Sequence, residues 1–234
     1  MALEARRQDL NIYLTHDIME QIVLGRGFHR CEQQKEKPMA VEHSEHKERI
    51  SLEEFFALLE RDPEHRYEYI DGYAYMMTGG SPDHSIIGAN LNRILGEQLR
   101  KRPCIVYISD VLIELADQNC LCPDASVSCD RRDRHAVKVI HYPCLVAEVL
   151  SPATKARDRG IKSELYQNIP TVQEILFIDT QVMRIQLYRR ETDYWTMRNF
   201  TQDDTVELTS VGVHFSVDEV YEKTTFDNTF TEEA

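Results

Sequence analysis

The chain has 234 residues, of which 42% are hydrophobic and 29% are charged, as in ordinary folded domains. Its apolar runs fall short of the roughly 20 residues that cross a bilayer, and its start lacks the apolar core and cleavage site of a secretory signal. We therefore expect one sizeable cytoplasmic domain with no membrane partner, and six cysteines that remain thiols in a reducing compartment.

The net charge of −13 argues against a nucleic-acid partner, but the charge is unevenly distributed. Residues 201–234 contain one basic and nine acidic residues, so much of the acidity lies near the C-terminal end. Basic clusters at 100–102, 131–134 and 155–162 permit contacts with phosphate groups. Taken alone, each cluster is equally compatible with a solvated surface of mixed charge.

The cysteines do not predict a structural zinc site. Cys120, Cys122 and Cys129 lie close together, but they form no C-x-x-C pair and no matching Cys/His pair follows them.

The first part of the chain predicts little packed structure. Residues 1–48 are polar and show no sustained apolar period, so we expect a loose extension with at most a weak amphipathic helix near residues 9–24. Met39 is an alternative candidate for the native start of translation.

Clear periodicity begins at residue 51. "SLEEFFALLE" predicts a helix with a capping box, and "RYEYIDGYAYMM" predicts a hairpin around Asp71-Gly72. A helix is expected over 82–99 and another over 157–169. The predicted strands are "CIVYISDVLIEL", "PDASVSC", "YPCLVAEVLS", "EILFIDT", "MRIQLYRR", "YWTMRNF" and "TVELTS". This order predicts an α/β fold with a mixed sheet, a domain over 49–215 and an acidic tail over 216–234.

Two acidic residues stand at unusual places. Asp124 begins one predicted strand, and Glu148 lies inside the next, on the face of Val146 and Leu150. If these strands are neighbours, the two carboxylates converge, and a divalent cation such as Mg²⁺ is a natural partner for them. An equally weighted alternative is that one of them forms a structural salt bridge with an arginine.

The helix after the Glu148 strand adds a candidate cation. Asp158, Lys162 and Tyr166 are spaced i, i+4, i+8 and share one helix face. The lysine ammonium can face the strand end and offset charge on a phosphate. Without further context, the simpler interpretation is a helix ion pair between Asp158 and Lys162.

An ordered set of short motifs resembles a known family. These motifs are "YEYIDG", "SPDH", "SD" at 109–110, "PD" at 123–124, "EVLSP" at 148–152 and "DRGIKSELY" at 158–166. In this order they are similar to the Uma-type endonucleases (domain of unknown function 820), which are common in cyanobacteria and belong to the PD-(D/E)XK superfamily. The resemblance covers roughly residues 51–195.

The resemblance implies a restriction-endonuclease-like core in which a mixed β-sheet is flanked by helices. It implies a site in which Asp124 and Glu148 are catalytic and bind Mg²⁺, or alternatively Mn²⁺. The superfamily lysine is expected two positions after the Glu, where this chain has Leu150, so Lys162 would take its role. Glu68 and Asp110 would be metal-binding or supporting groups. His84, Asp158 and Tyr166 would be supporting residues.

The expected function is Mg²⁺-dependent hydrolysis of phosphodiester bonds in a nucleic acid, with DNA favoured and a homodimer compatible with cutting two strands. One alternative is a catalytically silent binding or regulatory module on the same fold, which the absence of the usual lysine favours. Another is a phosphodiesterase for a small phosphate-containing substrate, for which the acidic charge balance is less awkward.

Overall fold

The computed structural model describes residues 48–227. The predicted N-terminal extension over 1–48 lies outside the described residues, except for its last residue. The weak helix near 9–24 and the alternative start at Met39 also lie outside them. The last residues of the predicted acidic tail also lie outside them.

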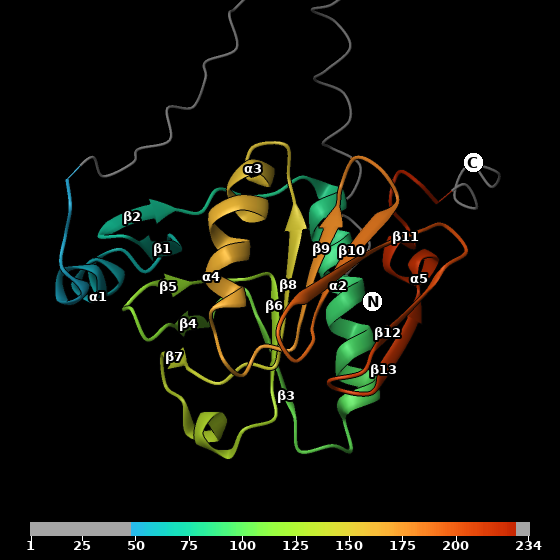
Figure 1. Cartoon of the computed structure of the whole chain (residues 1–234). Coiled ribbons are helices and arrows are strands. Elements are labelled where there is room, and N and C mark those ends of the chain that lie inside the picture. Colours follow the sequence, from blue (N-terminus) through green and yellow to red (C-terminus); the bar gives the residue numbers. More distant parts are fainter. Residues whose placement is uncertain (1–47, 228–234) are drawn as a thin grey trace, which may run out of the picture. The chain divides into compact units, whose positions relative to one another are not determined.

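The largest sheet is six-stranded, mixed, and has the order β11-β10-β9-β8-β6-β3. The central strands β8 and β9 are parallel and their neighbours are antiparallel. Figure 1 shows β8 and β9 side by side with α4 over one face. The bounds are β3 (Ile105–Ile108), β6 (Ala125–Ser128), β8 (Leu145–Leu150), β9 (Glu174–Asp179), β10 (Arg184–Arg190) and β11 (Trp195–Thr201).

Two smaller sheets complete the strands of the described region. A five-stranded sheet has the order β2-β1-β5-β4-β7, and a two-stranded sheet pairs β12 with β13. The bounds are β1 (Tyr67–Ile70), β2 (Tyr73–Met76), β4 (Leu112–Glu114), β5 (Cys120–Leu121), β7 (Val139–Ile140), β12 (Thr205–Leu208) and β13 (Val213–Ser216). The β1–β2 hairpin turns at Asp71 and Gly72, both with positive φ, as the sequence predicted.

Helices follow the predicted order. The capping box of Ser51 and Glu54 starts α1, and Ser81 caps α2. Among residues 48–227 no helix is long and apolar enough to cross a membrane. The bounds are α1 (Leu52–Arg61), α2 (Pro82–Leu99), a 3₁₀ turn η1 (Arg131–His135), α3 (Lys155–Arg157), a π-helical turn η2 (Asp158–Lys162), α4 (Ser163–Gln167) and α5 (Val217–Tyr221).

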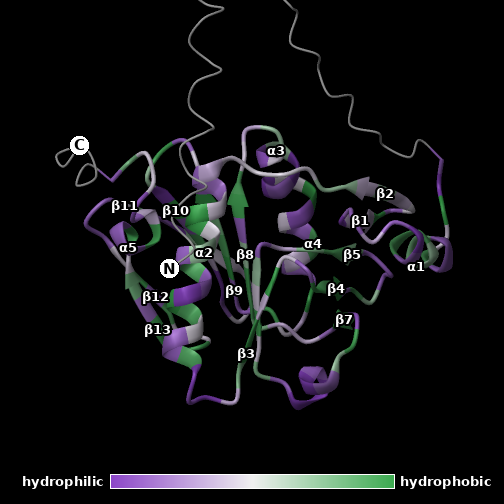
Figure 2. Cartoon of the chain, turned by 180° about the vertical axis from the view of Figure 1, so that it is seen from behind, coloured by the Kyte–Doolittle hydropathy of each residue, from purple (hydrophilic) through white to green (hydrophobic). Residues whose placement is uncertain are grey.

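The core has a layer on each face of the six-stranded sheet. Ala147 and Val149 of β8 face α2, whereas Val146 and Leu150 face α4 and the five-stranded sheet. Figure 2 shows apolar residues along β8 and an alternation of polar and apolar residues along α2. The α/β core with a mixed sheet flanked by helices is thus confirmed. The alternation also places Glu148 on the α4 side of the sheet.

Two predicted elements differ from the sequence expectation. The segment "CIVYISDVLIEL" forms two strands in different sheets, because the chain turns at Ser109–Val111, where backbone hydrogen bonds return to Ile108. The predicted helix over 157–169 begins at Lys155 and contains the π turn η2. That turn leaves Ile161 50% exposed and buries Lys162.

The tail boundary and the cysteine prediction also need correction. The packed fold continues past residue 215, since Val217, Val220 and Tyr221 of α5 are buried in the same core as α2. Cys104 and Cys129 form a disulfide, because β3 and β6 pair antiparallel and bring these residues together. The expectation that all six cysteines are thiols was therefore wrong.

Candidate active site

Asp124 and Glu148 meet through strand register. β6 and β8 are antiparallel neighbours, and Ala125 pairs with Ala147, so Asp124 stands opposite Glu148. The Asp124 carboxylate accepts a hydrogen bond from the Val149 backbone N–H (2.7 Å). The convergence predicted for these two acids is present in the structure.

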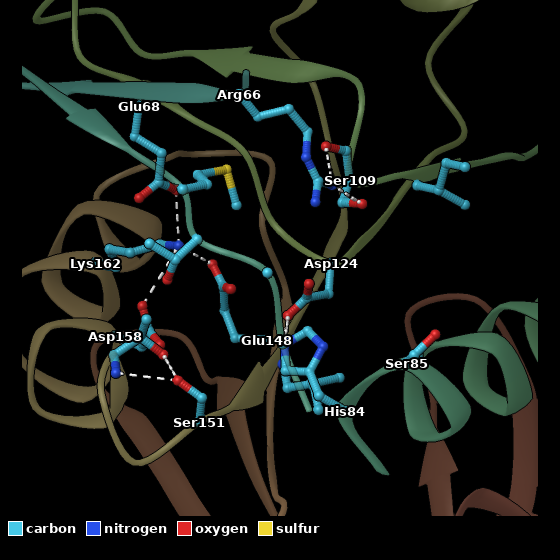
Figure 3. Close-up of a pocket in the computed structure, with 18 of the residues that line it drawn as sticks. Arg66, Glu68, His84, Ser85, Ser109, Asp124, Glu148, Ser151, Asp158 and Lys162 are labelled. Atoms are coloured by element: carbon cyan, nitrogen blue, oxygen red, sulfur yellow. Dashed lines mark hydrogen bonds and ion pairs between the residues drawn. The ribbon is translucent and has the colours of Figure 1, made fainter. Parts of the chain in front are cut away.

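Lys162 lies at the centre of an acidic cluster. Its Nζ is 2.7 Å from Glu68 Oε1, 2.5 Å from Glu148 Oε1 and 3.5 Å from Asp158 Oδ1. Figure 3 shows these three carboxylates converging on the lysine from a strand of each large sheet and from the helix that carries it. With 2% of its side chain exposed, Lys162 is a buried cation held by acids on three sides.

The helical segment around the π turn η2 carries three buried polar side chains. Asp158, Lys162 and Tyr166 are all buried on the inner face of the helical segment. The Tyr166 hydroxyl donates to Glu148 Oε1 (2.5 Å). Burial raises the pKa of Tyr166 well above its usual value, and the carboxylates of Glu148 and Glu68 raise it further, so the hydroxyl stays a donor. The shared face predicted from the i, i+4, i+8 spacing is confirmed, and it faces inward.

Burial and neighbouring charges shift the pKa values of Glu148 and Lys162 in this cluster. Burial raises the pKa of Glu148 well above its usual value, and although Lys162 opposes this, Asp158, Asp124 and Glu68 add to it. Burial favours neutral Lys162, yet the surrounding carboxylates outweigh burial and raise the lysine pKa well above its usual range. The lysine therefore stays protonated at neutral pH, whereas burial favours the neutral form of Glu148.

These groups line a pocket of about 480 Å³. His84 contacts Asp124 with Nε2 to Oδ2 at 3.5 Å. The hydrogen bond to Asp124 raises the pKa of His84, against the effect of partial burial. Sequence reasoning did not assign Arg66 and Arg157, which also line the pocket. Arg157 belongs to the basic cluster at 155–162. The cluster alone does not show which side of the helix carries the Arg157 side chain.

The carboxylate pair fits a hard divalent cation. Among residues 48–227 no three His, Cys, Asp or Glu side chains are arranged to hold a metal ion. Mg²⁺ typically binds one or two carboxylates and completes its shell with water and phosphate oxygens, which suits Asp124 and Glu148. Nearby, Glu68 Oε2 is buried without a hydrogen-bond partner, so acceptor capacity remains unused in the cluster.

Asp110 does not join this cluster. The turn after β3 leaves its side chain 69% exposed, where it faces Arg66 Nη1 at 3.8 Å, and it does not line the pocket. Its neighbour Ser109 lines the pocket instead and accepts from Arg66 (Figure 3). The structure therefore does not support Asp110 as a metal ligand. Glu68 is present in the cluster, but as a partner of Lys162.

The sheet, the helical segment and the carboxylate pocket define a protein of the restriction-endonuclease-like class. A family model named Uma2, described as "Putative restriction endonuclease", matches residues 52–218. The chain belongs to the Uma2 family.

Two relatives are uncharacterized proteins of Synechocystis sp. The first is 42% identical over 175 residues, covering 74% of this chain and 92% of the relative. The second is 29% identical over 129 residues, covering 54% of this chain and 73% of the relative. Neither adds an assigned activity.

A solved structure from Anabaena variabilis shares the fold. It is described as a "putative nuclease belonging to DUF820" and matches with a TM-score of 0.62 and 20% identity, over 74% of this chain and 97% of that one. At this identity the likeness shows the fold alone. Together with the family description, it is consistent with a nuclease.

Proposed function

We propose that this chain is a Mg²⁺-dependent endonuclease that hydrolyses phosphodiester bonds in a nucleic acid, with DNA as the favoured substrate and Mn²⁺ as an alternative cofactor. The observation that carries the proposal is the placement of Asp124 opposite Glu148, with Lys162 against Glu148, in one open pocket. A cation held by these two acids supplies charge neutralisation at the phosphate and lowers the pKa of bound water.

The chain's own residues have separate roles in this proposal. Arg66 and Arg157 line the pocket and provide guanidinium groups for phosphate oxygens. His84 lies beside Asp124, and its raised pKa favours the protonated imidazole, which can donate to the leaving oxygen. Lys162 stays protonated, so it fixes Glu148 and Glu68 in position and contributes positive charge, but does not act as a general base.

Cleavage with defined metals tests this function. Wild-type protein is incubated with plasmid DNA, single-stranded DNA and RNA in MgCl₂, MnCl₂ or EDTA. We expect metal-dependent cutting that Asp124→Asn and Glu148→Gln abolish, while Glu97→Gln, an exposed acid on α2 that does not line the pocket, leaves it unchanged. Cutting that persists in Glu148→Gln contradicts the assignment.

One observation favours a catalytically silent binding module as the second candidate. Lys162 is almost fully buried and engaged by its acids, and Leu150, at the superfamily's usual lysine position, is fully buried. Three results together support this candidate. The protein binds DNA, it does not bind Mg²⁺, and it cleaves neither the nucleic acids above nor a small phosphodiester.

Location and assembly belong to the same proposal. We propose that the protein acts in the cytoplasm, as its sequence led us to expect. We propose a homodimer because two pockets allow both strands of a duplex to be cut. Fractionation of native cells and sedimentation of the purified protein measure these two properties.

A further inference from the structure

A second group of charged side chains lies at the end of β9. Asp179 is 1% exposed, and its Oδ2 lies 2.7 Å from Lys155 Nζ, 3.1 Å from Arg184 Nη2 and 3.5 Å from Arg159 Nη2. Its Oδ1 accepts from the Gln181 backbone N–H (3.0 Å). Lys155 and the Gln181 amide already provide hydrogen bonds to both oxygens of the Asp179 carboxylate. The two arginines are therefore not needed to compensate for the burial of this acid.

The group therefore carries excess positive charge. Lys155, Arg159 and Arg184 share the carboxylate of Asp179. Among residues 48–227, none of the three cations forms an ion pair with another acid. Arg159 Nε and Nη2 and Arg184 Nε are buried without hydrogen-bond partners. The three side chains remain 27–36% exposed, so solvent and ligands can reach them. An unneutralised cationic group is unusual on a chain with net charge −13.

Its position links it to the candidate active site. Lys155 and Arg159 are one helical turn apart and share a face, whereas Arg157 lies about 200° around the helix axis. Arg157 lines the carboxylate pocket, and Lys155 and Arg159 contact Asp179. Figure 1 shows α3 beside the end of β8, at the upper end of the helical segment that continues into α4. The helical segment formed by α3 and η2 therefore presents cations to the pocket on one side and to the Asp179 group on the other.

We propose that Lys155, Arg159 and Arg184 form a phosphate-binding subsite that holds the nucleic-acid backbone next to the scissile position. The subsite rests on the proposed function for its ligand class. A phosphate at the exposed side of the two guanidinium groups neutralises the positive charge that Asp179 does not balance. Guanidinium groups also match the geometry of phosphate oxygens. The backbone then crosses α3, with one phosphate in the pocket and a neighbouring phosphate at the subsite.

Equilibrium binding in EDTA tests the subsite without requiring cleavage. The probe is a short fluorescent DNA duplex, measured by anisotropy over a range of NaCl concentrations. The test variant Arg159→Gln/Arg184→Gln leaves Lys155 on the buried carboxylate and so preserves its partner. The matched control, Arg93→Gln/Lys138→Gln, removes two exposed cations, paired with Glu97 and Glu60, that line neither the pocket nor the subsite. The single variant Arg184→Gln provides a milder change.

We expect the test variant to bind the duplex about tenfold more weakly at low salt, with a salt-dependence slope smaller by about 1 to 2, because each backbone phosphate contact contributes nearly one. Arg184→Gln should show a smaller loss, and the control should bind like the wild type. Wild-type affinity in the test variant, equal losses in the control, or no binding by the wild type overturns the subsite. A wild type that binds in this pattern but never cleaves contradicts the proposed function and leaves the subsite standing.

Discussion

The ammonium of Lys162 lies 2.5 Å from Glu148 Oε1, and both side chains are almost completely buried. Glu148 and Lys162 come from the central strand β8 and from the helical segment that follows it, so this ion pair joins the two elements that build the pocket. Removing one member of such a pair leaves buried charge without a partner.

Replacing Lys162 therefore tests the structural importance of the cluster. Lys162→Met should destabilise the fold by about 3–5 kcal/mol, measured by urea unfolding, because Glu68, Glu148 and Asp158 lose their shared cation. The loss should shrink at acidic pH, since protonation neutralises the remaining carboxylates. The exposed pair between Lys138 and Glu60 provides the control: Lys138→Met should leave the free energy of unfolding nearly unchanged, because solvent screens this pair. Equal losses in the two variants contradict this prediction.

The titration of His84 tests its contact with Asp124. Its hydrogen bond to Asp124 raises the pKa of His84 above 6.5 in the folded protein. The stabilisation from this contact is therefore fully present below pH 6.5 and is lost as the pH rises through the folded-state pKa. In metal-free protein, the imidazole NMR titration should move to lower pH in Asp124→Asn. The resonances of His65, whose pKa is raised by Asp62, should not move. An unchanged His84 titration contradicts the contact.

Two adjacent glycines give a matched test of the His84 position. A Cβ at Gly80 would lie 2.5 Å from His84 Cγ and 2.6 Å from Nδ1, whereas a Cβ at Gly79 meets nothing within 4 Å. Gly80→Ala should therefore shift the imidazole and reduce metal-dependent cleavage, while Gly79→Ala should leave cleavage near the wild-type rate. Equal activity of the two variants means that the His84 position does not matter for the reaction.

The Cys104–Cys129 disulfide predicts the thiol content of the purified protein. Unfolded, unreduced protein should react with a thiol reagent at two fewer sites than its six cysteines provide. Cys104→Ser should release Cys129, so the variant should show one more reactive thiol than the wild type. Six reactive thiols in the wild type would show that the pair is reduced.

Much of the site follows from local sequence patterns. Strand alternation brings Asp124 and Glu148 together once β6 and β8 pair, which the sequence analysis had to assume. Helical spacing is sufficient to align Asp158 with Lys162. The role of Glu68 is not local, because β1 belongs to a different sheet and reaches Lys162 only through tertiary packing.

The differences from the sequence expectation have similar causes. Asp110 lies in the turn that breaks an otherwise continuous apolar stretch, whereas periodicity alone places it in a strand. Cys104 and Cys129 meet because β3 pairs with β6, which spacing along the chain does not reveal. The basic cluster at 155–162 includes Lys155 and Arg159 but not Arg184, which comes from β10 and reaches Asp179 only in the folded chain.

Binding of Mn²⁺ to the metal-free protein shows whether Asp124 and Glu148 hold a divalent cation, and it does not depend on a substrate. Isothermal titration should detect a site in the wild type that is lost in Asp124→Asn and retained in Glu97→Gln. Equal Mn²⁺ binding by the wild type and Asp124→Asn, or none by the wild type, contradicts the account.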